Sequence, residues 1–194
     1  MAMEPKGIDA LRALQEAGHS EAAVTAILEQ HGGAFYGYIA SIVGDESLAA
    51  DAFQLFSLRL WQAFPEFRWE SKLTTWAYAI ARNAAYGALR DPHRKRAAAL
   101  GTAEELAIAA RLTRTTTAMW ERTEEKQRLW TQIEALPSED RELLLLRVSS
   151  KLSWAEVVAV LTPETVEPTE VKRQAAVLRK RFERVKEQLK LALR

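Results

Sequence analysis

The amino-acid sequence predicts an all-α protein, built as two small helical domains that are joined by a linker. Through most of the chain, apolar residues recur every three or four positions, which is the spacing of one helix face. The 8 Gly and 6 Pro residues mostly lie between these periodic segments, where helices are expected to end. No segment shows the strict alternation of apolar and polar residues that is typical of a strand.

The first 90 residues are expected to form five helices and one loop. Gly32-Gly33 separates the second helix from the third, and Pro65 ends the fourth, which Asp45 or Ser47 caps. The loop at 65–71 reads PEFRWES and carries two aromatic residues. The expected helices span residues 8–17, 21–30, 34–43, about 46–63 and 72–90.

The second half is expected to hold four helices after an Ala- and Thr-rich stretch, which we interpret as the linker. Ser153 and Glu156 form a capping box, with Leu152 and Val157 placed as its hydrophobic staple. The expected helices run from near Glu121 to Leu136, from Ser138 to about Ser149, from the capping box to Leu161, and from Pro168 onward. The chain therefore divides into an N-terminal helical extension, a domain, the linker and a second domain, at residues 1–30, 31–96, 97–125 and 126–194.

Basic residues gather in two blocks, although the formal net charge is only +1. Residues 72–96 hold six Lys or Arg against one Asp, and residues 171–194 hold nine against two Glu. Acidic residues outnumber basic ones in 1–60 and 121–170. Such blocks favour a polyanion bound at two separate places; the alternative is basic helix surfaces without that function.

The last two expected helices have the order of a helix-turn-helix unit: a short helix, a turn and a basic amphipathic helix. In such a unit Arg and Lys reach phosphates, while Arg, Lys and Gln reach base edges. The turn at 162–168 is longer than the roughly 3–4 residues of the usual motif, so a three-helix bundle with a basic last helix is the alternative. The polar residues concerned are Lys172, Arg173, Gln174, Arg179 and Lys180.

Aromatic and basic residues lie close together in the 65–71 loop and the helix after it. Aromatic rings beside cations can stack on unpaired bases, and a module that opens a DNA duplex needs this combination. The alternative is that several of these rings, Trp76 above all, are core residues. The residues concerned are Arg68, Trp69, Lys72, Trp76, Tyr78, Arg82, Tyr86 and Arg90.

We expect no enzyme activity, cofactor or metal, because no catalytic or ligand-binding pattern appears in the sequence. The absence of Cys excludes disulfides, thiolate metal sites and thiol nucleophiles, and the three His residues stand apart at 19, 31 and 93. No apolar run approaches the ~20 residues that span a bilayer. The N-terminus does not read as a signal peptide, so a cytoplasmic location is expected.

Two segments resemble the bacterial sigma-70 family, and specifically its extracytoplasmic-function (ECF) group. Residues 35–96 resemble region 2 in the runs Ile42-Val43-Gly44-Asp45, Ala50-Asp51-Ala52-Phe53-Gln54, Leu58-Arg59-Leu60-Trp61, Phe67-Arg68-Trp69-Glu70-Ser71 and Thr75 to Asn83. Residues 133–190 resemble region 4 in Leu136-Pro137, Leu146-Arg147, the capping box from Leu152 to Val157, and Val171-Lys172. Both segments occur in the family's order, with a variable linker between them.

The resemblance implies a promoter-specific transcription initiation factor that binds core RNA polymerase at the beta-prime clamp and the beta flap. It further implies promoter DNA and an anti-sigma factor as partners. The implied core-polymerase residues are Asp51, Gln54, Leu55, Arg59 and Trp61. The implied minus-ten residues, which bind and melt DNA, are Arg68, Trp69, Lys72, Trp76, Arg82, Asn83, Tyr86 and Arg90. The implied minus-thirty-five residues are Lys172, Arg173, Gln174, Arg179 and Lys180.

Three departures from the family pattern bear on these roles. Leu55 stands where the family usually has an acidic residue, Trp69 stands where Gly is common, and the 162–168 turn is long. The competing interpretations are a helix-turn-helix regulator that binds DNA without polymerase, and a sigma-like interaction protein that does not initiate transcription. A further hypothesis is that the linker lets the two domains close on each other or on a partner. Residues 1–30 receive no role.

Overall fold

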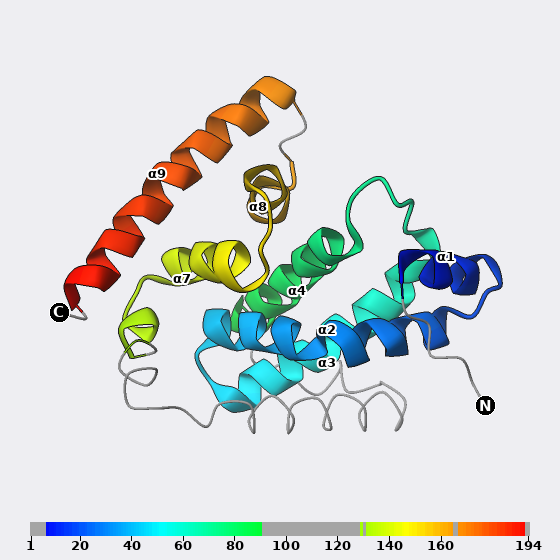
Figure 1. The fold of residues 1–194 in the computed structure, drawn as a ribbon. Coiled ribbons are helices and arrows are strands. Elements are labelled where there is room, and N and C mark those ends of the chain that lie inside the picture. Colours follow the sequence, from blue (N-terminus) through cyan, green and yellow to red (C-terminus); the bar gives the residue numbers. More distant parts are fainter. Residues whose placement is uncertain (1–6, 91–128, 130, 165–166, 193–194) are drawn as a thin grey trace.

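The computed structural model describes residues 7–90, 129, 131–164 and 167–192, and these residues contain helices and no strand (Figure 1). This confirms the predicted all-α class. The predicted linker at 97–125, and most of the helix expected from Glu121, lie outside the described residues. The helices of the first half are α1 (Ile8–Glu16), α2 (Ser20–Val43), α3 (Glu46–Ala63) and α4 (Leu73–Arg90), with a 3-10 turn, η1 (Phe64–Glu66), after α3.

Helices α2, α3 and α4 pack against one another (Figure 1). Aromatic rings form part of the core between them. The Phe35 ring lies 5.2 Å from that of Phe56 and 4.8 Å from that of Tyr78, measured between centroids. The Asp45 side chain accepts a hydrogen bond from the Leu48 amide, so Asp45 caps α3 as predicted. Helix α1 lies against α2 and extends the first half at its N-terminal end (Figure 1).

The predicted break at Gly32-Gly33 is wrong, because α2 continues through both residues to Val43. Each Gly in a helix costs about 1 kcal/mol relative to Ala. Phe35 and Ile39, which follow them, are 1% and 0% exposed, and burial of such side chains stabilises a helix by about 1.5–3 kcal/mol each. Tertiary contacts therefore outweigh the local preference for a break.

The second half contains α7 (Ser138–Leu144), a π-helical turn η3 (Leu145–Ser149), α8 (Trp154–Leu161) and α9 (Pro168–Ala192). The predicted capping box is confirmed: the Ser153 side chain accepts from the Glu156 amide, and the Glu156 carboxylate accepts from the Ser153 amide. Leu152 and Val157, the predicted staple, are both buried.

The two halves lie directly against each other. Helix α8 packs on α4, and α7 packs on α2, while α9 packs on α7 and α8 along the far side (Figure 1). Buried apolar residues of both halves form one connected cluster. Contacts between the halves therefore cover part of α4, which carries several predicted minus-ten residues.

Candidate nucleic-acid interface

Three side chains of the first half converge on a single carboxylate of the second half. Tyr38 Oη and Arg82 Nε donate hydrogen bonds to Glu142 Oε1 over 2.7 and 2.8 Å, and Tyr86 Oη donates to Oε2 over 3.1 Å. We call Tyr38, Arg82 and Tyr86 the carboxylate cradle. Glu142 is only 1% exposed, so the cradle supplies the hydrogen bonds that this carboxylate would otherwise receive from water.

The cradle keeps its three donors in the protonated form at neutral pH. Burial raises the pKa of Tyr38 well above its ordinary value, and Glu142 raises it further. The pKa of Tyr86 is raised for the same two reasons. Burial lowers the pKa of Arg82, but the charge and hydrogen bond of Glu142, together with Tyr38 and Tyr86, outweigh burial and the net shift is upward. The Arg82 guanidinium also lies 4.7 Å from the Tyr86 ring centroid.

A second ion pair joins the halves at the start of α4. Lys72 Nζ lies 2.8 Å from Glu156 Oε1. Burial raises the pKa of Glu156, but hydrogen bonds with Lys72 and Ser153 outweigh burial and lower the pKa to about 2. The Lys72 side chain is 71% exposed, so solvent weakens this pair relative to the buried cradle. Two predicted minus-ten cations, Lys72 and Arg82, are thus in contact with carboxylates of the second half.

Helix α1 holds the aromatic loop through one side chain, Gln15. Gln15 Nε2 lies 2.7, 3.2 and 2.9 Å from the carbonyl oxygens of Phe64, Pro65 and Phe67. Its Oε1 accepts a hydrogen bond from Trp69 Nε1 over 2.5 Å. One amide therefore fixes both the backbone of the loop and the side chain at its tip.

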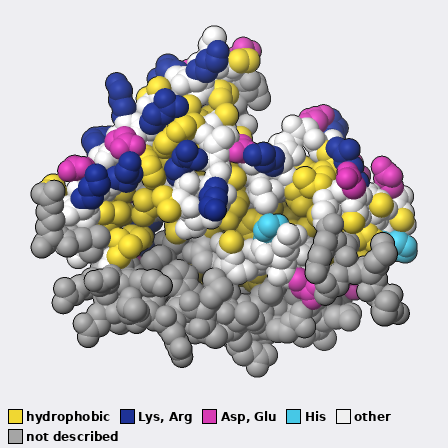
Figure 2. Space-filling model, viewed as in Figure 1, with side chains coloured by type: hydrophobic (Ala, Val, Ile, Leu, Met, Phe, Trp, Pro, Cys, Tyr) yellow, Lys and Arg dark blue, Asp and Glu magenta, His cyan; other side chains and the backbone are white. Residues whose placement is uncertain are grey.

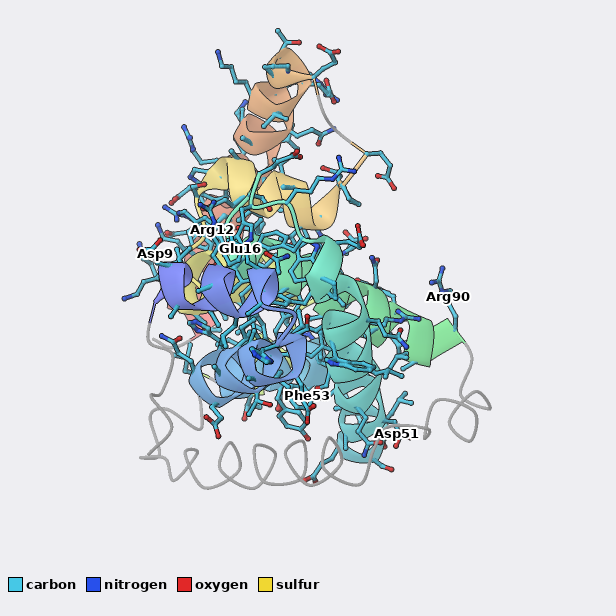
Figure 3. The ribbon with its side chains drawn as sticks, turned by 90° about the vertical axis from the view of Figure 1, so that its right-hand side faces the viewer. Asp9, Arg12, Glu16, Asp51, Phe53 and Arg90 are labelled. Carbon is cyan, nitrogen blue, oxygen red and sulfur yellow. The ribbon has the colours of Figure 1, made fainter. Side chains whose placement is uncertain are left out.

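Trp69 has a backbone conformation that favours Gly. Its φ is 61°, in the left-handed region where Cβ crowds the following carbonyl. The indole ring packs on Phe64 and Phe67, with centroids 6.3 and 4.9 Å apart, and the Arg12 guanidinium lies 5.1 Å from its centroid. Helix α1, on which Figure 3 labels Arg12, therefore helps to hold Trp69 in place.

The remaining predicted minus-ten residues differ in their exposure. Arg68, Asn83 and Arg90 are exposed, and Arg90 extends from the end of α4 (Figure 3). Trp76 is half-buried and stacks on Phe67 with centroids 4.5 Å apart, so its ring has a structural partner.

Tyr78 is not available to stack on a base, and that prediction is wrong. It is 3% exposed, and its ring meets the rings of Phe35 and Tyr38 edge-on. Tyr78, which lies on α4, was grouped with the aromatic residues that could stack on unpaired bases. The helix is covered on more than one side, by α2, α3 and α8, and this burial accounts for the difference.

Helix α9 carries the five predicted minus-thirty-five residues in its N-terminal half. Figure 2 shows Lys and Arg side chains gathered over this helix. Glu170 accepts hydrogen bonds from Arg173 and Gln174, and these bonds lower the pKa of Glu170 to about 2. Arg179 lies 5.7 Å from the centroid of the Trp154 ring on α8. The residues exposed in this set are Lys172, Arg173, Arg179 and Lys180, and Gln174 is half-buried.

The predicted core-polymerase residues lie on α3. Trp61 is 40% exposed, so a large part of its indole ring is open to solvent. Leu55, the predicted departure from an acidic residue, is half-buried and packs against the core. Asp51, Gln54 and Arg59 are also partly buried, and Figure 3 places Asp51 on α3.

The sequence interpretation missed three residues that organise this surface: Gln15, Tyr38 and Glu142. Gln15 gave no signal, because a Gln on a helix is ordinary. Glu142 gave a weak one, since it is an acidic residue directly before the apolar run Leu143–Leu146.

Within the described ranges, no group of three or more His, Asp or Glu side chains is arranged to hold a metal ion. No helix in the described part of the chain is long and apolar enough to cross a membrane.

Residues 27–96 match the family model of Sigma-70 region 2. The matched segment begins within α2 and includes α3, the aromatic loop and α4, which carry the predicted core-polymerase and minus-ten residues. It covers just over a third of the chain and ends before α7. No curated protein matches the chain. The match supports a sigma-factor role in transcription initiation, with core RNA polymerase and promoter DNA as partners.

Proposed function

We propose that this protein is a sigma factor of the ECF group, which binds core RNA polymerase and directs it to promoters. The observation that carries the proposal is the region 2 match, because it coincides with the helix bundle α2–α4 and with the aromatic loop. The catalyst is the polymerase, and this chain contributes promoter choice and strand opening. A cytoplasmic location and an anti-sigma partner are part of the same proposal.

Each surface has a proposed task in this account. The α3 residues Asp51, Gln54, Leu55, Arg59 and Trp61 dock on the clamp of the beta-prime subunit. The aromatic loop and α4 bind and open the minus-ten element. The second half meets the beta flap, and the basic half of α9 contacts the minus-thirty-five element. Cations on an exposed helix suit DNA, because they reach phosphates and displace counterions.

Titration of purified core RNA polymerase tests the docking surface. Trp61→Ala should weaken polymerase binding by about thirtyfold, since an exposed Trp at an interface commonly contributes about 2 kcal/mol. Ile8→Ala removes another exposed apolar side chain, 59% exposed on α1, and should leave the affinity unchanged. A wild-type chain that fails to bind the polymerase contradicts the proposal.

A further inference from the structure

The carboxylate cradle has the chemistry of an anion site. Its two phenols and one guanidinium surround one negative charge and supply donors to both carboxylate oxygens. A DNA phosphodiester likewise carries one negative charge shared by two free oxygens. The planar fork of Arg matches the geometry of both carboxylate and phosphate, so Arg82 can pair with either anion.

The ligand that now fills the cradle comes from far along the chain. Glu142 is separated from Tyr38 by 104 residues and from Arg82 by 60. It belongs to α7 in the second half, whereas the three cradle residues belong to α2 and α4 of the first half. The contact can therefore break when the halves separate, without disruption of α2, α4 or α7.

We propose that the cradle is an anion site with two exchangeable ligands: the Glu142 carboxylate in the free chain, and a backbone phosphate of DNA once the halves separate. The inference rests on the proposed function, because Arg82 and Tyr86 belong to the proposed minus-ten surface. Free chain then binds DNA poorly until polymerase separates the halves.

The second ion pair supports this exchange from an independent position. Glu156 forms an ion pair with Lys72, as Glu142 does with Arg82. Two carboxylates of the second half therefore neutralise two cations of the first half. Separation of the halves removes the carboxylate partner of both cations and leaves them free to pair with DNA phosphates. It also returns both carboxylates to water, so neither is left buried without a partner.

The test measures DNA binding by the free full-length chain. The probe is a fluorescein-labelled duplex with a single-stranded overhang, followed by fluorescence anisotropy. Glu142→Gln should tighten binding by about tenfold, since a hydrogen bond to a buried charge commonly shifts an equilibrium by at least that factor. Glu156→Gln weakens the second ion pair and should tighten binding in the same direction, because it leaves Lys72 and all three cradle donors available to DNA.

Glu139→Gln is the matched control, because it removes one negative charge from the same helix but outside the cradle. Glu139 is 66% exposed and pairs with Arg181. A gain from Glu142→Gln that exceeds the gain from Glu139→Gln supports the exchange. Equal gains in the two variants indicate a general charge effect and overturn it.

Distances between the halves provide the second readout. The chain has no Cys, so Ser47→Cys and Ala176→Cys place two spin labels without competition. Glu142→Gln should lengthen the distance distribution; an unchanged distribution overturns the inference. A longer distance without tighter DNA binding also overturns it, because the emptied cradle then takes no phosphate. If Glu142→Gln loses helicity by circular dichroism, DNA affinity and the distance between the halves are measured on Glu156→Gln instead, and the same outcomes support or overturn the inference.

Polymerase binding, measured in parallel, separates this inference from the proposed function. If the wild-type chain binds core polymerase but the variants bind DNA with unchanged affinity, the inference is overturned and the proposed function is not. Wild-type chain that does not bind the polymerase contradicts the proposed function, whatever the variants do.

Discussion

Replacement of Gln15 by Met should loosen the aromatic loop and lower the free energy of unfolding. Met has a similar length and keeps the apolar contacts of the side chain, but it cannot donate to the loop carbonyls or accept from the Trp69 indole. The variant therefore isolates the polar contribution of one residue on α1. It tests the idea that α1 positions the part of the molecule proposed to open DNA.

The magnitude follows from the contacts of the Gln15 amide. Its nitrogen has two hydrogens, so its three carbonyl contacts amount to two donated bonds, and its oxygen accepts one more. Three bonds at about 1 kcal/mol each contribute about 3 kcal/mol. Release of the left-handed Trp69 returns about 1 kcal/mol of backbone strain. The expected net loss in the free energy of unfolding is about 2 kcal/mol.

Urea denaturation of the full-length chain, followed by circular dichroism, measures this loss. Fluorine-labelled Trp gives a second readout, in which Trp69→Phe identifies the resonance of Trp69 and Gln15→Met should shift it. Glu16→Met places the same residue at an exposed neighbouring position and should leave stability and resonance unchanged. A Gln15→Met variant with wild-type stability and an unmoved Trp69 resonance refutes the reasoning.

Two further predictions concern charges of the second half. Lys172→Ala combined with Arg173→Ala should weaken binding of the polymerase complex to upstream promoter DNA, with polymerase binding unchanged; gel-shift titrations at fixed salt measure both. Lys186→Ala combined with Lys190→Ala removes the same charge from the other end of α9 and should have a smaller effect, and equal losses contradict the assignment. The Glu156 pKa is lowered from 4.5 to about 2, so its stabilising contribution is complete above pH 4.5 and is lost as the pH falls toward 2. Glu156→Gln removes the titrating group, so the free energy of unfolding should change less between these pH values than in the wild type. The expected difference is only about 1 kcal/mol, because the Lys72 partner is largely exposed. Wild-type and variant curves of equal slope contradict the prediction.

Local signals in the sequence predicted the local structure well. Asp45 caps α3, Ser153 and Glu156 form the capping box, and α3 ends at Ala63, directly before the 3-10 turn that contains Pro65. Each of these features depends on residues within about four positions of one another, so a short segment of the sequence is enough to predict it. The error at Gly32-Gly33 came from the same local rule, because the burial that sustains α2 there is not visible in a short window.

The organisation of the candidate site could not be read from the sequence. Gln15 meets Trp69 across 54 residues, and Glu142 meets Tyr38 across 104. Such contacts depend on how helices pack, and neither a Gln nor a Glu on a helix surface indicates its partner. Within the described residues, the two predicted basic blocks lie at α4 and on α9, but the sequence does not show that carboxylates of the second half contact Lys72 and Arg82.

Run-off transcription measures whether this chain directs initiation by core RNA polymerase. The reaction contains purified bacterial core RNA polymerase and a library of randomised promoters, with and without this chain. We expect discrete transcripts that appear only with the chain, and their aligned upstream sequences should contain two conserved elements. An absence of transcripts while polymerase binding is intact contradicts initiation and favours a sigma-like interaction protein. An absence of both, with duplex DNA bound by the chain alone, favours a free-standing helix-turn-helix regulator.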